Sequence, residues 1–109
     1  MSARMAAESY FAAVNDCDAS RLAALFSEDA VLEHPGGTFV GRGAIVAFYR
    51  ETVLALQTYL TATAMVQEGR RCVAEFEGRS PLGDDIVYAC DVFEVDETGA
   101  VTNLHIYIR

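Results

Sequence analysis

The chain has 109 residues, of which 52% are hydrophobic, and its net charge of −8 comes with eight arginines and no lysine. A chain of this length is predicted to form one domain over residues 1–109, and it can bury enough surface to fold without a metal or a disulfide. The acidic balance argues against nucleic acids and anionic membranes as partners, because both require a basic face. No apolar run is long enough to span a bilayer.

The cysteines indicate a reducing compartment. Cys17, Cys72 and Cys90 are odd in number and show no C-x-x-C spacing. This pattern is typical of reduced cytosolic thiols rather than of a disulfide framework or a metal site. The first eight residues are too short and too interrupted by polar side chains to form a secretory signal. We therefore expect a cytoplasmic protein.

The chain is predicted to begin with two helices. Apolar residues recur at helical spacing over residues 3–15 and predict an amphipathic helix there. Asp18 or Ser20 can cap a short second helix that continues through Phe26. Residues 27–29 are expected to end this second helix.

A small hairpin and a third helix are predicted next. Residues 30–34 alternate like a strand, the Pro-Gly-Gly sequence at 35–37 forms a turn, and residues 38–40 return along the first strand. A third amphipathic helix is expected over about residues 44–56, because its apolar residues form a stripe at helical spacing.

The second half of the chain is predicted to consist of strands. They cover residues 59–66, 71–77, 86–95 and 101–108 and are joined by short turns and one longer loop. Helices followed by an antiparallel meander indicate an α+β fold. A curved sheet that wraps around the helices would enclose a cone.

The strand over residues 86–95 is apolar on both faces and contains one carboxylate, Asp91. Val87, Ala89, Asp91 and Phe93 share the face that can line the cone. The other face also has to avoid water, which favours a homodimer formed through the sheet over a merely central strand. A buried carboxylate must be paired, hydrogen-bonded or protonated. Asp91 is therefore the first candidate for chemistry.

Four segments of the chain resemble the nuclear transport factor 2-like (NTF2-like) superfamily, and most of all its ketosteroid isomerase and SnoaL-like polyketide cyclase branch. They read YFAAVN at 10–15, LFSEDAVLEHP at 25–35, GRGAIVAFY at 41–49 and DVFEVDETG at 91–99. These segments span nearly the whole chain in the family's order. The resemblance implies an NTF2-like (cystatin-like) cone, in which three N-terminal helices pack on a curved, mainly antiparallel sheet. This fold hosts many reactions.

Ketosteroid isomerases hold a substrate ketone with a tyrosine and a protonated aspartate, while a carboxylate moves a proton between two carbons. By resemblance, the tyrosine falls on Tyr10, the protonated aspartate on Asp91, and a supporting tyrosine on Tyr49. The family's proton-moving aspartate precedes the proline of the first hairpin, and the residue at this position is His34. The chain departs from the isomerases at that residue.

His34 is the candidate general base. Strand alternation places it on the same face as Leu32, so its ring should point into the cone, where burial lowers its pKa. A neutral imidazole there can accept a proton; the alternative is a core histidine without a catalytic role. Asp91 also has alternatives to the neutral donor. It can be ionised and orient His34, or it can bond to loop amides, and ionisation would require a lowered pKa.

The pocket is expected to be lined by apolar and aromatic side chains of the helices and strands, namely Val14, Leu32, Phe48, Tyr49, Ala89, Phe93 and Ile106. His105 is expected to face outward, toward a dimer partner. Two histidines on separate strands, without carboxylates at ligand spacing, do not indicate a metal site. No glycine-rich phosphate or dinucleotide motif is present, so we expect neither a metal nor a cofactor.

The residues and the resemblance together predict a cofactor-independent acid–base enzyme. Its substrate would be a small hydrophobic carbonyl compound, steroid-like or polyketide-like, that reacts through an enolate. A dehydratase or an epoxide hydrolase that uses the same pocket is an alternative. A second alternative is a module that binds a small ligand, or a protein partner, without catalysis.

Overall fold

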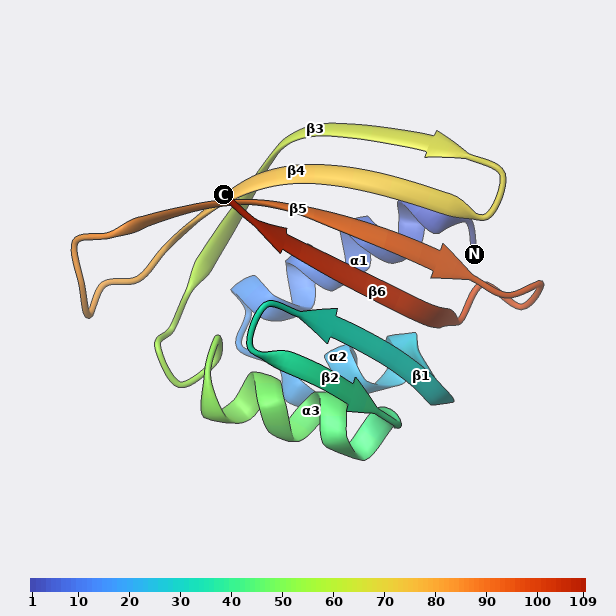
Figure 1. Ribbon diagram of the computed structural model, residues 1–109, viewed down its shortest axis with the longest axis horizontal. Helices are drawn as coiled ribbons and strands as arrows, with labels where there is room; N and C mark the ends of the chain where they lie inside the picture. The colour runs from blue at the N-terminus through green and yellow to red at the C-terminus, as the bar shows by residue number, and fades with distance from the viewer.

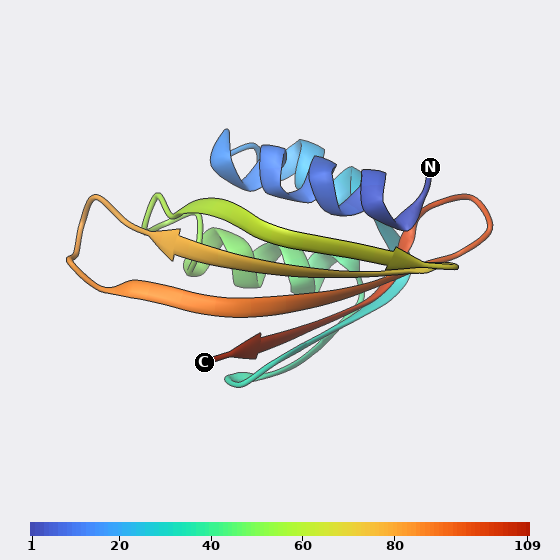
Figure 2. The same cartoon turned by 90° about the horizontal axis from the view of Figure 1, so that it is seen from above.

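The computed structural model describes residues 1–109 and contains three helices and one six-stranded sheet. The elements are α1 (Ala3–Asn15), α2 (Ala19–Leu25), β1 (Phe26–His34), β2 (Gly37–Val40), α3 (Arg42–Glu51), β3 (Tyr59–Glu68), β4 (Arg71–Arg79), β5 (Ile86–Val95) and β6 (Val101–Ile108). The helices pack on one side of a sheet that bends around them (Figures 1 and 2). This arrangement confirms the predicted α+β cone.

The strands follow the order β2-β1-β6-β5-β4-β3 across the sheet. All neighbouring strands are antiparallel except β1 and β6, which run parallel. The pairing shifts register within β1, within β3 and near the end of β5. Such irregularities bend strands and increase their twist, which lets one sheet curve around the helices. None of the three helices combines the length and hydrophobicity needed to cross a lipid bilayer.

The predicted bounds of α1, β5 and β6 are those of the structure. The prediction that residues 27–29 end the second helix was wrong, because α2 ends at Leu25 and these residues belong to β1. Phe26 pairs with Val101 of β6, and the carbonyl oxygen of Phe26 accepts two hydrogen bonds from the Arg42 guanidinium, at 3.0 and 2.8 Å. These tertiary contacts extend the strand into a segment that has no alternating pattern.

The third helix was predicted to continue to residue 56, but α3 ends at Glu51. Residues 52–57 form a series of turns, and Gln57 adopts a left-handed backbone conformation with φ of 54°. Val53 and Leu56 are apolar because they line a cavity. Their spacing therefore imitates a continuing helix stripe.

The inner face of the sheet consists of cross-strand rows of side chains. One row, Cys72, Phe93, Leu104 and Leu32, is fully buried beneath the helices. The next row holds Ala74, Asp91 and Ile106, and the third holds Phe76, Ala89 and Ile108. The strands thus lead from a closed core, through the row of Asp91, to a more open end.

Asn15, the last residue of α1, ties this helix to the start of β3. Its Nδ2 donates to the carbonyl oxygen of Leu60 at 2.9 Å, and its Oδ1 accepts from the backbone N–H of Leu60 at 2.7 Å. β3 is an edge strand, so this side chain pairs backbone groups at the sheet edge where a neighbouring strand is missing.

We expect Asn15→Ala to lower the free energy of unfolding by about 1–3 kcal/mol, because both backbone groups of Leu60 lose their partner. Urea unfolding measures the loss. Asn15→Asp is the matched variant, since it keeps the acceptor for the Leu60 N–H but sets a carboxylate oxygen against the Leu60 carbonyl oxygen, and it should also be less stable than the wild type. An alanine variant as stable as the wild type would show that water replaces the side chain without cost.

Candidate functional site

Two tyrosine hydroxyls meet inside the cone. Tyr10 comes from α1 and Tyr49 from α3, and their hydroxyl oxygens are 2.5 Å apart. Both side chains are buried, and the Tyr10 ring packs edge-on against Tyr49 and against Phe93 of β5. Burial raises the pKa of both phenols well above its usual value, and an ionised Asp91 would raise it further. Both hydroxyls are therefore neutral at pH 7, and one of their two protons is free to reach a ligand.

Asp91 is fully buried, and neither of its carboxyl oxygens has a hydrogen-bond partner. Its cross-strand neighbours on the inner face are Ala74 and Ile106, which offer only apolar side chains. Burial raises the pKa of the carboxyl group well above its usual value. This environment does not agree with an ionised carboxylate that orients His34 or with bonds to loop amides. It supports the neutral carboxylic acid.

His34 ends β1 and is half-buried. Its ring packs against Phe48 with the centroids 5.0 Å apart, and burial lowers its pKa, so the imidazole is neutral at pH 7. The backbone N–H of Gly36 donates to Nδ1 at 2.9 Å. Because Nδ1 accepts this bond, the single proton of the neutral ring resides on Nε2.

Tyr10, His34 and Tyr49 line a cavity of about 200 Å³ at the open end of the cone. Its wall is largely hydrophobic, and the polar side chains in the wall are Tyr10, His34, Tyr49, Thr52 and Thr58. Thr52 donates its hydroxyl proton to the carbonyl oxygen of Phe48 at 2.6 Å. The wall contains no carboxylate, lysine or arginine, so its chemistry is that of hydroxyls and one imidazole.

The structure brings most of the predicted site residues together. Tyr10, His34, Phe48, Tyr49, Ala89 and Ile106 all line the cavity. Val14, Leu32 and Phe93 do not line it, and each is fully buried in the core. Strand and helix periodicity indicates which face of the sheet or helix a residue occupies. It does not indicate which part of that face the helices cover. Asp91 lies in the row between the core and the cavity.

The sequence did not predict the part of the wall that follows α3. Thr52, Val53, Leu56 and Thr58 line the cavity from the turns after this helix. The spacing of Thr52, Val53 and Leu56 predicted the last turns of the helix, and Thr58 lies beyond the predicted helix. Gly36, which orients His34, was also missed, because a hydrogen bond from a turn amide leaves no signal in residue type.

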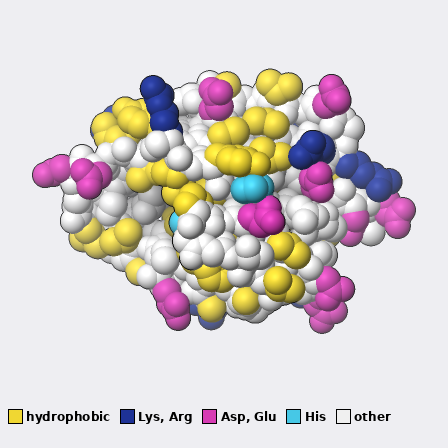
Figure 3. Space-filling model, viewed as in Figure 1, with side chains coloured by type: hydrophobic (Ala, Val, Ile, Leu, Met, Phe, Trp, Pro, Cys, Tyr) yellow, Lys and Arg dark blue, Asp and Glu magenta, His cyan; other side chains and the backbone are white.

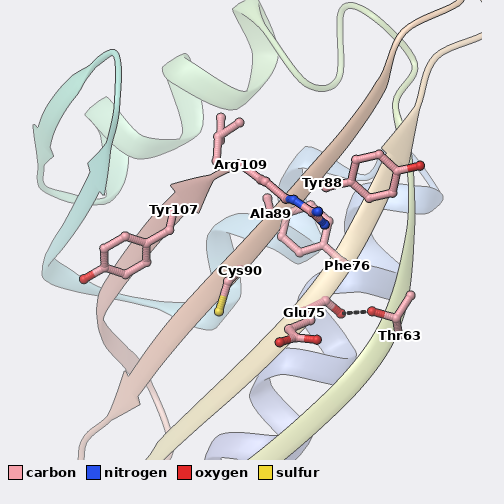
Figure 4. A pocket seen from close by; sticks show the side chains of 9 residues that line it. Thr63, Glu75, Phe76, Tyr88, Ala89, Cys90, Tyr107 and Arg109 are labelled. Atoms are coloured by element: carbon pink, nitrogen blue, oxygen red, sulfur yellow. Dashed lines mark hydrogen bonds between the residues drawn. The ribbon is translucent and has the colours of Figure 1, made fainter.

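The outer face of the sheet carries the other histidine. His105 Nδ1 lies 2.9 Å from a Glu33 carboxyl oxygen, and its ring stacks on Tyr107 with the centroids 4.0 Å apart. A second hollow, of about 330 Å³, lies on this face between Tyr88, Cys90, Tyr107 and Arg109 (Figure 4). No group of three His, Cys, Asp or Glu side chains is arranged to hold a metal ion. The hydroxyl pair of Tyr10 and Tyr49 and the imidazole of His34 are therefore the candidate site, on the inner side of the sheet.

The SnoaL-like domain family matches residues 7–104 of the chain. The protein belongs to this family. It has the NTF2-like (cystatin-like) fold that the resemblance implied. A comparison with proteins of curated function finds none that matches.

Solved structures share the fold of this SnoaL-like protein. A ketosteroid isomerase-like protein from Kribbella flavida is 24% identical, with a TM-score of 0.88 over 98% of this chain and 77% of that one. A polyketide cyclase-like protein from Sinorhizobium meliloti is 20% identical, with a TM-score of 0.85 over 94% and 93%. RV0760c from Mycobacterium tuberculosis, solved with estradiol-17β-hemisuccinate, is 20% identical, with a TM-score of 0.85 over 96% and 92%. At these identities the likeness establishes the fold.

The neutral Asp91 should make stability fall as pH rises. Because its pKa in the folded state is raised, the folded protein binds a proton that the unfolded chain releases above pH ~4. We expect Asp91→Asn to remove a slope of about 1.4 kcal/mol per pH unit from the free energy of unfolding. The free energy of unfolding of the variant should rise relative to that of the wild type as the pH increases above ~4, as measured by urea unfolding at several pH values.

Asp96→Asn is the control, because it should change the pH dependence of the free energy of unfolding in the opposite direction. Hydrogen bonds from Thr98 and neighbouring amides lower the pKa of Asp96, so its stabilisation is present at neutral pH and is lost as pH falls. Asp96→Asn should therefore weaken the protein most at neutral pH. If the difference between Asp91→Asn and the wild type did not change with pH, Asp91 would titrate alike in both states.

Proposed function

We propose that this SnoaL-like protein is a cofactor-independent enzyme that acts on a hydrophobic carbonyl compound through its enolate. One observation carries the proposal: the hydroxyl pair of Tyr10 and Tyr49 reaches an apolar cavity beside the neutral, unpartnered Asp91. Donors that are already oriented in a water-poor site stabilise a developing oxyanion more strongly than water does. The carbonyl oxygen would accept from the tyrosine pair, with the Asp91 carboxyl proton close behind it.

The state of His34 determines which substrates could form an enolate in this cavity. With its proton on Nε2 and Nδ1 engaged by Gly36, the neutral ring offers the cavity a donor instead of the base that the sequence predicted. A substrate with an acidic C–H of its own, such as a methylene between two carbonyls, ionises without a strong base once its oxygens are hydrogen-bonded. Its proton would pass to water at the cavity mouth. This favours ring closure of a polyketide-like compound over isomerisation of a ketosteroid.

The size of the cavity supports the same choice. Its volume of about 200 Å³ is below the range of about 300–1,000 Å³ that is typical of pockets for drug-sized ligands. A molecule of one or two rings, or one end of a longer chain, suits this space better than a whole steroid. Leu56, Val87 and Ile108 line the cavity and are each 40–51% exposed, so a longer ligand would meet further apolar surface at the rim.

Binding without turnover is the second candidate, and the absence of a free base in the cavity wall favours it. The steroid derivative held by the Mycobacterium tuberculosis neighbour is consistent with either function, because both need an apolar ligand with an acceptor oxygen. Enolate chemistry and simple binding differ in whether the C–H bond of a bound ketone is broken.

Exchange of a carbon-bound proton tests the enzyme directly. We expect the wild type to accelerate exchange of the benzylic hydrogens of β-tetralone in heavy water, followed by NMR. Tyr10→Phe should reduce the rate on the order of a hundredfold, because it removes a donor to the oxyanion. Tyr59→Phe is the matched control, since Tyr59 is exposed and outside the cavity. Binding of β-tetralone without exchange would favour the ligand-binding module, and absence of both would contradict both candidates.

The outer face of the sheet supports a homodimer. Val66, Val73 and Val92 form a cross-strand row on this face, with Tyr88 and Tyr107 partly exposed nearby. Hydrophobic side chains gather over the middle of the face (Figure 3). A contiguous apolar patch of this kind is unusual on a monomer. The dimer would act in the cytoplasm, where its three free thiols stay reduced.

We expect the molar mass of the wild type, measured by sedimentation, to be twice the 11.8 kDa of one chain. Val73→Glu should shift the protein toward the monomer, because it places a charge in the middle of the apolar row. Leu82→Glu is the control: Leu82 is exposed in the loop between β4 and β5 and should leave the dimer intact. Analytical ultracentrifugation over a range of concentrations measures both variants. A wild type that remains monomeric at all concentrations would contradict the proposed dimer.

A further inference from the structure

The turn after β1 controls which proton His34 presents. Gly36 lies two residues beyond the histidine, and its backbone N–H reaches back to Nδ1 at 2.9 Å. The opposite tautomer would set an N–H of the ring against the N–H of Gly36. That tautomer loses the hydrogen bond and leaves the two donors facing each other. The turn therefore selects the tautomer with the proton on Nε2.

The absence of a side chain at Gly36 is part of this arrangement. A Cβ atom at this position would lie 3.2 Å from Nδ1 and 3.6 Å from Cε1 of His34. The first of these distances is closer than an ordinary van der Waals contact, so a larger residue would push the ring away. Glycine allows the backbone amide and the imidazole to approach to hydrogen-bond distance.

The cavity consequently has two donor groups, and one aromatic ring contacts both. Phe48 packs against His34 and against Tyr49, with centroid distances of 5.0 and 5.4 Å. The tyrosine pair is the first donor group, and His34 Nε2–H is the second. The other side chains of the wall are apolar, apart from Thr58 and from Thr52, whose hydroxyl proton is donated to the Phe48 carbonyl oxygen.

We infer that His34 donates its Nε2–H to a second acceptor oxygen of the ligand, and that Gly36 is the positioning residue that makes it do so. The ligand class is then an apolar molecule with two acceptor oxygens, one at the tyrosine pair and one at His34. This inference rests on the proposed function, since it assigns a second recognition point to the same carbonyl-binding cavity. It holds for an enzyme and for a binding module alike.

The tautomer is measured first, on the ligand-free protein, from long-range couplings between carbon-bound ring protons and ring nitrogens in a nitrogen-15 NMR spectrum. We expect His34 in the Nε2–H form at pH 8. His105 is an internal reference of the opposite kind, because its Nδ1 faces the Glu33 carboxylate and should carry a proton. His34 in the Nδ1–H form would overturn the inference.

Ligand binding tests the second acceptor. The probes are decalone and the decalin dione of the same skeleton, with its carbonyls on opposite rings, titrated by calorimetry. The wild type should bind the dione about three- to tenfold more tightly, the gain of one hydrogen bond. His34→Gln keeps an N–H donor near the position of Nε2 and should retain the preference. His34→Leu should lose it while still binding decalone.

The variants separate this inference from the proposed function. Equal affinity of the wild type for both ketones, or loss of the preference in His34→Gln, would overturn the role of His34 and leave carbonyl binding at the tyrosine pair intact. If neither ketone bound to the wild type, the proposed function would fail together with the two-oxygen ligand, whatever the tautomer. Gly36→Ala, which crowds the ring, should reduce the preference for the dione without reducing decalone affinity.

Discussion

Asp91 lies on the inner face of the sheet between Ala74 and Ile106, and neither of its carboxyl oxygens has a hydrogen-bond partner. Burying a polar group in this way costs free energy, and the carboxyl group reduces that cost by staying protonated. The rest of the site follows from this constraint. A neutral acid beside two neutral phenols supplies hydrogen-bond donors without adding charge, so the adjoining cavity can stay apolar. A group whose burial lowers stability at neutral pH is typical of a functional site.

The geometry of the sheet determines where this donor is useful. The row of Cys72, Phe93 and Leu104 closes the core beneath the helices, while the row of Phe76, Ala89 and Ile108 opens toward the cavity. Asp91 lies between them, at the transition from packed interior to binding space. Asp91 does not itself line the cavity. A shift of one row toward the mouth would expose it to water and let it ionise.

The hairpin turn contributes a further part of the wall. Its backbone amide fixes the proton of His34 on Nε2, which makes the histidine a donor like the tyrosines. A site built from donors in an apolar wall recognises apolar molecules that carry acceptor oxygens, and it stabilises negative charge that develops on those oxygens. Such a site relies on the acidity of its substrate, which distinguishes it from one with a carboxylate base. The SnoaL-like fold accommodates both kinds, because the fold positions side chains and does not dictate the reaction.

The sequence by itself determined the elements with strong periodicity, such as α1, β5 and β6, and the face to which Asp91, Tyr10 and Tyr49 belong. Periodicity reports sidedness directly, because residues of one face recur at fixed spacing. Only the tertiary structure decided where α3 ends, that Val14, Leu32 and Phe93 lie in the core instead of the cavity wall, and which nitrogen of His34 carries the proton. These features depend on how far each helix covers the sheet and on one backbone amide two residues away, and neither depends on residue type alone.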